Sequence, residues 1–287
     1  MTASKDEPMT CDISLEEVSG RTLRVARWRL DKPSDHPPIL FFNGIGANIE
    51  AVSPLAEKLT ERGFIMFDMP GTGESPDPTI PYNPFTMAWT ASRVLDRFGV
   101  DVADVMGVSW GGAMAQHFAL QHPGRTRRLV LAATTPGMLM VPGNISAISK
   151  MSDPRRYVDA KFMNEHFATL YGGLTKNPDA KAQHIGRLKP PSPRGYVYQL
   201  LAMLGWTSLP ALPFLAKETL VMMGERDTIV PVINGRILAS LIPNARLEIF
   251  PDGGHLFLLT HPEESVAMLR DFLDAPDTER EARRAAA

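Results

Sequence analysis

The sequence predicts an α/β fold in which a mostly parallel central sheet carries helices on both faces. Short apolar or β-branched runs alternate along the chain with longer stretches of helical pattern, which is the order expected of a parallel sheet. The 287 residues, 44% of them hydrophobic and 22% charged, are enough to bury a substantial core. One long stretch interrupts the alternation and predicts a helical insertion.

The strands are expected where apolar runs are short and bounded by turn residues. In chain order they fall at 22–30, 39–42, 64–67, 104–108, 128–131, 219–223 and 245–250. The first of them alternates apolar and polar residues, whereas most of the others are continuous apolar runs, as in strands buried on both faces.

Helices are expected between these strands, at about 49–62, 85–98, 111–122 and 232–241. A last helix is expected to begin at Pro262, because proline loses no hydrogen bond at the first helical position and two glutamates follow it.

The alternation stops between about Pro136 and Pro213. This stretch contains no convincing strand pattern, yet it is rich in Met, Tyr, Trp and Pro, and a structureless loop of such length is uncommon. We therefore expect a helical cap at 136–213, inserted over the carboxyl edge of the sheet. The core would then consist of residues 1–135 and 214–287.

Composition excludes several classes of protein. Thirty Lys and Arg against 32 Asp and Glu give a net charge of −2, which argues against a nucleic-acid binder. Cys11 is the single cysteine, so no intrachain disulfide framework exists, and the seven histidines show no metal-site spacing. No apolar run reaches the roughly 20 residues of a transmembrane helix, and the first residues lack the apolar middle of a signal peptide. We expect a cytoplasmic protein that needs no metal or cofactor.

A candidate nucleophile lies in the pentapeptide Gly107-Val108-Ser109-Trp110-Gly111. The pattern follows an apolar strand and leads into a helical stretch, which is the strand–turn–helix setting of a nucleophile elbow. Small residues on both sides permit a strained turn that exposes the serine oxygen. The alternative is a glycine-rich turn in which the serine only caps the helix.

A serine hydroxyl needs a base to act as a nucleophile at neutral pH, and the base needs an orienting carboxylate. We predict that Asp227, just past the strand expected at 219–223, is this acid. Glu225 is the weaker candidate because it lies too close to the strand end, and Asp227 could alternatively cap the next helix. His255, in a glycine-flanked loop before the last helix, is the predicted base. His261 competes with it, but His-Pro-Glu-Glu is typical of a helix start.

Acyl transfer also needs N–H donors for the oxyanion that develops in the transition state. One donor is expected to be the backbone N–H of Trp110, immediately after the nucleophile. The other is expected to be the backbone N–H of Ile45, in the loop that follows the strand at 39–42. Gly44 and Gly46 flank Ile45 and permit a close approach of the backbone.

These motifs resemble the α/β-hydrolase superfamily and, within it, the intracellular poly(3-hydroxyalkanoate) depolymerases of the medium-chain-length type. The similarity spans roughly residues 20 to 273 and includes the insertion. The motifs that carry it lie at 42–48, 107–112, 140–143, 154–158, 171–173, 205–208 and 254–258. The resemblance places the catalytic Ser, Asp and His at Ser109, Asp227 and His255.

The resemblance implies a serine hydrolase that cleaves an aliphatic polyester of 3-hydroxy acids through an acyl-enzyme. Polymerases of the same polyester carry Cys at the elbow, so Ser109 favours hydrolysis over synthesis. The implied partners are a hydrophobic polyester or ester and the surface of a storage granule. Apolar residues of the insertion could line a tunnel or dock on that granule. The alternatives are a carboxylesterase or C–C bond hydrolase for small soluble substrates, and a receptor or scaffold built on the same fold.

Overall fold

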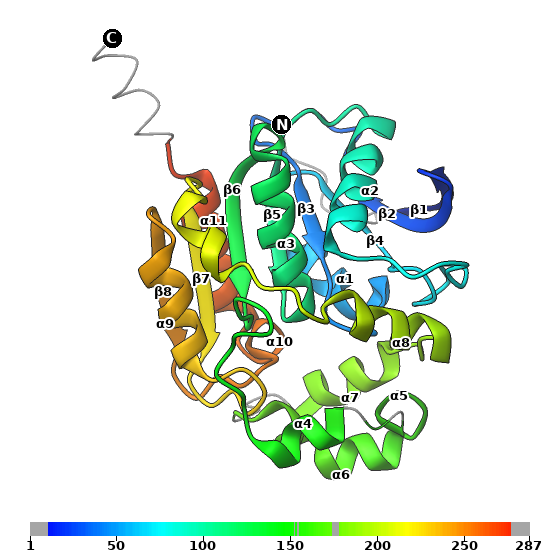
Figure 1. Cartoon of the computed structure of the whole chain (residues 1–287), viewed down its shortest axis with the longest axis vertical. Coiled ribbons are helices and arrows are strands. Elements are labelled where there is room, and N and C mark those ends of the chain that lie inside the picture. Colours follow the sequence, from blue (N-terminus) through cyan, green and yellow to red (C-terminus); the bar gives the residue numbers. More distant parts are fainter. Residues whose placement is uncertain (1–10, 152, 154, 174–177, 277–287) are drawn as a thin grey trace, which may run out of the picture.

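The computed structural model describes residues 11–151, 153, 155–173 and 178–276. An eight-stranded sheet in the order β1-β2-β4-β3-β5-β6-β7-β8 lies between two layers of helices (Figure 1). The β1–β2 and β2–β4 pairs are antiparallel, and every other neighbouring pair in the sheet is parallel. The predicted α/β fold with a mostly parallel sheet is confirmed.

Each strand expected from the sequence is present. The strands are β1 (Cys11–Val18), β2 (Arg21–Trp28), β3 (Ile39–Phe42), β4 (Phe64–Phe67), β5 (Ala103–Val108), β6 (Thr126–Ala132), β7 (Thr219–Gly224) and β8 (Ala245–Phe250). The four-residue strands β3 and β4 and the six-residue β7 are buried at every position, which is why they consist largely of continuous apolar runs.

The strand β1 was missed by the sequence reasoning. It is the edge strand of the sheet, and Ile13 and Leu15 are 44% and 61% exposed, so no buried apolar run marks it. The available signal was the turn that joins it to β2. Ser19 and Gly20 both have positive φ, 53° and 72°, as a two-residue hairpin of type I′ requires.

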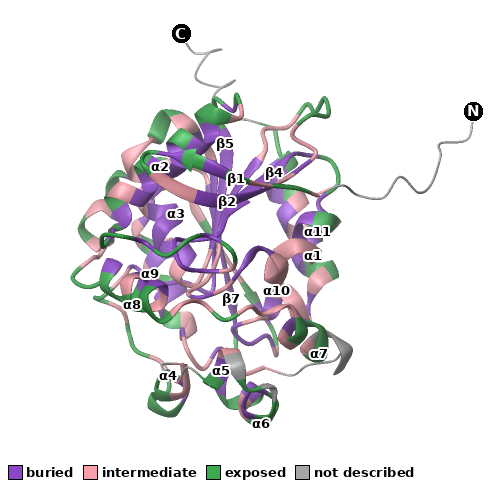
Figure 2. Ribbon diagram, turned by 90° about the vertical axis from the view of Figure 1, so that its right-hand side faces the viewer, coloured by how far each residue is buried: buried purple, intermediate pink, exposed green. Residues whose placement is uncertain are grey.

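The helices outside residues 136–213 lie on the two faces of the sheet, as expected. They are α1 (Ile49–Lys58), α2 (Pro84–Arg97), α3 (Trp110–Gln121), α9 (Val232–Leu241), α10 (Phe257–Thr260) and α11 (Pro262–Asp274), with a short 3₁₀ turn η1 (Pro123–Arg125). Figures 1 and 2 show α2, α3 and α9 on one face, and α1 and α11 on the other. Each layer has its own cluster of buried apolar side chains, which meet the sheet from opposite sides.

The part of the chain between β6 and β7 forms a group of helices, which we call the helical segment (136–213). It contains α4 (Ile145–Met151), α5 (Arg155–Val158), α6 (Ala160–Tyr171), α7 (Pro178–Arg187) and α8 (Pro193–Ala202), together with all but the last residue of the 3₁₀ helix η2 (Leu209–Phe214). Helices α4 to α7 lie together at one end of the sheet (Figure 1). The division of the chain into a core and a cap stays a prediction.

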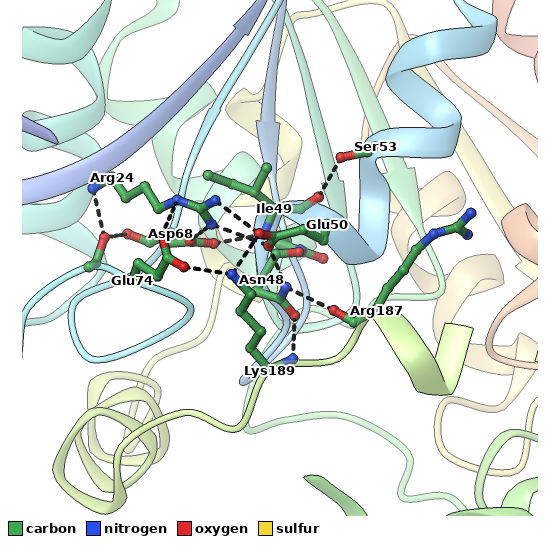
Figure 3. A network of polar contacts seen from close by, with 11 residues as sticks. Arg24, Asn48, Ile49, Glu50, Ser53, Asp68, Glu74, Arg187 and Lys189 are labelled. Atoms are coloured by element: carbon green, nitrogen blue, oxygen red, sulfur yellow. Dashed lines mark hydrogen bonds and ion pairs between the residues drawn. The ribbon is translucent and has the colours of Figure 1, made fainter. Parts of the chain in front are cut away.

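A network of polar contacts connects the end of α7 with the residues between β3 and α1 (Figure 3). The Asn48 side chain, just before α1, donates to the carbonyl of Arg187 (3.0 Å) and accepts from the amide of Lys189 (3.1 Å). The amide of Ile49 donates to Asp68, which is in turn paired with Arg24. Residues far apart in sequence are thereby fixed beside the loop that follows β3.

Candidate active site

Ser109 lies in the tight turn between β5 and α3, as expected from the glycine-flanked pentapeptide. Its backbone angles are φ 54° and ψ −120°, a left-handed conformation that is strained for any residue with a side chain. Its amide donates to the carbonyl of Ala132 (2.9 Å), and its carbonyl accepts from the hydroxyl of Thr134 (2.7 Å). These hydrogen bonds to the neighbouring strand and loop hold the strained turn in place.

The two glycines of the pentapeptide are required by close packing. A Cβ atom on Gly107 would overlap the carbonyl of Gly111, and a Cβ atom on Gly111 would overlap the carbonyl of Phe42. Because backbone atoms cannot move aside as a flexible side chain can, neither position accepts a larger residue. The elbow is therefore packed directly against the end of β3, where the loop with Ile45 begins.

Asp227 and His255 are brought together from the loops after β7 and β8. Nδ1 of His255 lies 2.7 Å from Oδ2 of Asp227, and both side chains are buried. The other carboxylate oxygen, Oδ1, accepts hydrogen bonds from the amides of Ile229 and Val230, each at 2.8 Å. A carboxylate only accepts, so Nδ1 of the imidazole is the donor and Nε2 is left with a lone pair.

His255 is also held from the helical segment by Tyr171. The amide of His255 donates to the carbonyl of Tyr171 (2.6 Å), and the two rings stack with centroids 6.4 Å apart. Burial raises the pKa of the Tyr171 hydroxyl. His184 approaches the same tyrosine edge-on, and burial lowers the pKa of its imidazole to about 4, so this histidine is neutral at physiological pH.

Ser109 and His255 both line a cavity of about 360 Å³. Much of its apolar lining comes from residues outside the helical segment, and the helical segment adds Met151, Leu188 and several polar residues. The apolar lining residues outside the helical segment include Ala51, Val52, Leu55, Leu256, Leu258, Leu259 and Val266. Asp227 is not among the lining residues, because it lies behind His255. The cavity therefore exposes the predicted nucleophile and base to a largely apolar space.

The loop after β3 presents Ile45 to the same cavity. The amide of Gly44 donates to the Asn43 side chain (2.9 Å), and the amide of Gly46 donates to the Gln199 side chain (2.8 Å). Within the described part of the chain, the amides of Ile45 and Trp110 have no hydrogen-bond partner. Neither predicted oxyanion donor is therefore used in a hydrogen bond among the described residues, and Ile45 lines the cavity whereas Trp110 does not.

The helical segment contributes polar lining residues to which the sequence assigned no role, namely Arg156, Tyr157, Tyr171, Gln183, His184 and Arg187. Tyr157 donates its hydroxyl to the carbonyl of Ile45 (2.7 Å), which links this segment to the loop after β3. The only indication of these residues in the sequence was the pair of motifs at 154–158 and 171–173. These motifs indicated similarity to the depolymerase family but assigned no role to any of their residues. The apolar stretches 138–141 and 196–206 contribute no residue to the cavity lining.

The competing candidates lie elsewhere. The side chain of Glu225 is exposed and accepts from the amide of Asp252 (3.4 Å). His261 is the residue before the first turn of α11, as its sequence context indicated, and it pairs with the hydroxyl of Thr260. Among the described residues, no three His, Cys, Asp or Glu side chains gather as they would to hold a metal ion.

Comparison with known proteins identifies the family. The model of the alpha/beta hydrolase fold family matches residues 37–262. The chain belongs to this family. A poly(3-hydroxyalkanoate) depolymerase from Ectopseudomonas oleovorans is 43% identical to it over 259 residues, which are 90% of each chain. The resemblance inferred from the motifs is therefore confirmed, and it includes the helical segment.

Three further α/β hydrolases are similar to this chain at lower identity. A 2-hydroxymuconate semialdehyde hydrolase from Pseudomonas putida is 31% identical over 75% of this chain and 78% of its own length. The solved structure of an enol-lactonase from Burkholderia xenovorans LB400 aligns with a TM-score of 0.74, covering 91% of this chain and 100% of the other at 20% identity. An esterase from Exiguobacterium antarcticum gives a TM-score of 0.77 at 19% identity, over 91% and 99% of the two chains. These two structures support the fold alone.

Proposed function

We propose that this α/β hydrolase cleaves the ester bonds of an aliphatic poly(3-hydroxyalkanoate) in the cytoplasm. The observation that carries the proposal is the Asp227–His255 pair, whose histidine lines one apolar cavity together with Ser109, in a chain 43% identical to a poly(3-hydroxyalkanoate) depolymerase. An apolar cavity suits an alkyl polyester, because binding removes the apolar surface of the polymer's side chains from water.

In the proposed mechanism, the oxygen of Ser109 attacks the ester carbonyl while Nε2 of His255 takes its proton. Asp227 holds the imidazole in the required tautomer through its hydrogen bond to Nδ1. The amides of Ile45 and Trp110 stabilise the oxyanion. The proton passes from His255 to the leaving alcohol, and water then releases the acyl group from Ser109 by the same steps. The proposed mechanism requires no metal or cofactor.

We further propose that the helical segment is a cap inserted between two parts of one core, 1–135 and 214–287. The cap supplies one wall of the cavity and, from other residues, an exposed apolar face. That face comprises Met138, Leu139, Val197, Leu200, Leu201 and Leu204, which are between 47% and 70% exposed. The amide of Met138 donates to the carbonyl of Trp206 (2.9 Å), so the two stretches lie side by side. We assign this face to contact with the storage granule.

Turbidity measurements on amorphous granules test the substrate class. Granules with medium-length side chains should clear in the presence of the enzyme, and granules with short side chains provide the comparison. A series of soluble p-nitrophenyl esters, measured in parallel, reports the ester hydrolase activity alone. The Ser109→Ala variant is the control in each assay. Rapid cleavage of soluble esters without clearing of either granule would reject the polyester as substrate.

The second candidate function is hydrolysis of a small soluble ester or of a C–C bond. The observation in its favour is the 31% identity to a 2-hydroxymuconate semialdehyde hydrolase over 75% of this chain. The lower identity and coverage make it the weaker candidate. In the granule experiment this candidate predicts no clearing.

A further inference from the structure

Arg156 is a buried cation that lines the cavity beside the proposed catalytic residues. It is 4% exposed, and its guanidinium donates to the hydroxyls of Tyr157 and Tyr196 and to the carbonyl of Ile45 (3.4 Å). It also lies 4.1 Å from the centre of the Tyr157 ring. All of these partners are neutral, and the Nε atom has no hydrogen-bond partner in the described structure.

The absence of an anion sets Arg156 apart from the other buried arginines. Among the described residues these are Arg24, Arg62 and Arg128, and each forms an ion pair with at least one carboxylate. No carboxylate of the described residues pairs with Arg156. Burial raises the pKa of the Tyr157 hydroxyl, so this tyrosine supplies no negative charge. A guanidinium buried without an anion is unfavourable, which is a cost that a bound anion would remove.

We propose that Arg156 binds the carboxylate at the free acid end of a 3-hydroxy acid chain. This inference rests on the proposed function and specifies it further: the enzyme would remove the terminal unit of the polymer or of its oligomers. The planar guanidinium suits a carboxylate, and the neighbouring tyrosine rings exclude water from the contact.

The position of Arg156 fits the chemistry of a terminal unit. Its guanidinium contacts the carbonyl of Ile45, whose own amide is the proposed oxyanion donor, so the charge lies close to the reacting ester. In a 3-hydroxy acid ester only a methine and a methylene separate the ester oxygen from the next carboxyl group. A terminal carboxylate is therefore within a short reach of the scissile bond.

The reaction that follows is an ordinary ester hydrolysis with a defined leaving group. The oxygen of Ser109 bonds to the carbonyl carbon of the penultimate unit, and the bond from that carbon to the oxygen of the terminal unit breaks. The serine proton passes through His255 to the departing oxygen. The terminal unit leaves as a 3-hydroxy acid with its carboxylate unchanged, and water hydrolyses the acyl-enzyme.

A pair of substrates with the same scissile bond tests the proposal. The dimer of 3-hydroxyoctanoate with a free carboxylate is compared with its methyl ester. Hydrogen bonds to a charged group are worth about 1.5–3 kcal/mol, so the wild-type enzyme should favour the free acid in kcat/KM by roughly tenfold or more. Equal kcat/KM values for the two dimers in the wild-type enzyme would overturn the proposal without the need for any variant.

Variants of the adjacent residues Arg155 and Arg156 test which arginine produces the preference for the free acid. Arg156→Met should bring the ratio of the two kcat/KM values close to one, and Arg156→Lys should leave an intermediate ratio. Arg155→Met is the matched control, because the Arg155 side chain is 62% exposed and paired with Asp153, so the ratio should persist. If Arg156→Met lowers both kcat/KM values equally, the arginine has only a structural role and the proposal is wrong.

Binding to the inactive Ser109→Ala variant provides a readout that does not depend on turnover. Calorimetry should detect 3-hydroxyoctanoate binding to Ser109→Ala and a loss of that binding in the Ser109→Ala/Arg156→Met double variant. Acid binding without granule clearance would mean that the carboxylate site exists but the polyester assignment fails. Granule clearance without binding or preference for the acid would mean that the polyester assignment holds and the carboxylate site does not exist.

Discussion

The imidazole of His255 and the carboxylate of Asp227 are joined by a hydrogen bond of 2.7 Å inside the protein, although the two residues come from different loops. The second oxygen of Asp227 is fixed by the amides of Ile229 and Val230. The carboxylate therefore cannot rotate freely, and the direction in which it points determines the tautomer of the imidazole.

Asp227→Asn should reduce turnover by roughly 10³- to 10⁴-fold with little effect on the fold. The asparagine oxygen can still accept from the two amides, so its NH₂ group faces Nδ1 of His255. That nitrogen would then be an acceptor and Nε2 would carry the proton, which prevents it from taking the proton of Ser109. The measurement is kcat on a soluble ester, together with the melting temperature. Glu225→Gln is the control, and a larger loss in that variant would mean that Asp227 is not the acid.

Ser109→Ala should abolish hydrolysis of every ester while the protein remains folded. The hydroxyl lies at a turn and contributes little to packing, whereas the mechanism depends on it. A serine-directed phosphonate should add to Ser109 in the wild-type protein, as mass spectrometry of its peptides can show. Turnover by Ser109→Ala at the wild-type rate would rule out the proposed mechanism.

The strained backbone of residue 109 makes a separate prediction about stability. Its φ of 54° with ψ of −120° is costly for any side chain but accessible to glycine. Ser109→Gly should therefore be more stable than Ser109→Ala by about 1 kcal/mol, measured as the free energy of unfolding in urea. Equal stabilities would mean that the turn is not under strain.

The exposed apolar face predicts different effects on polymer and on soluble ester. Leu139→Asp should weaken granule hydrolysis strongly and leave p-nitrophenyl ester hydrolysis almost unchanged, because a short ester does not need the face. Loss of an apolar contact of about 100 Å² costs roughly 2–3 kcal/mol, or about a 30- to 150-fold weaker granule affinity. Leu15→Asp is a matched control, since both leucines are 61% exposed and Leu15 lies on the edge strand β1. Equal effects of the two variants would argue against a docking role.

The buried imidazole of His184 should make the free energy of unfolding depend on pH. Burial lowers the pKa of its imidazole from 6.5 to about 4, so between these values the unfolded chain binds more protons than the folded one. The contribution of His184 to the free energy of unfolding is therefore complete above about pH 6.5 and is lost as the pH falls toward 4. The loss amounts to roughly 3 kcal/mol at most. Urea unfolding at several pH values should give a shallower slope for His184→Gln, and an unchanged slope would contradict the assignment.

The sequence predicted most of the sheet because buried parallel strands are short apolar runs, and it predicted the elbow because close packing demands its glycines. The sequence could not show which of Arg155 and Arg156 lines the cavity. The two residues have the same side chain and adjacent positions, yet one is exposed and the other lines the cavity. Which one points inward depends on how α5 packs against distant residues, and no local pattern records that packing.

The hydrogen bonds of Asn48 connect the proposed cap to the loop that contains Ile45 in an unbroken series. Asn43 accepts from the amide of Gly44 and donates to the carbonyl of Asn48, whose side chain holds the end of α7 at Arg187. Helix α7 and the loop of Ile45 are therefore connected through these hydrogen bonds. A bulky chain that pushed α7 outward would pull on this loop and disturb the oxyanion donor, so it would bind without being cleaved. If the Ile45 amide is the oxyanion donor, we expect the width of a substrate to affect cleavage through the same residues that position this amide.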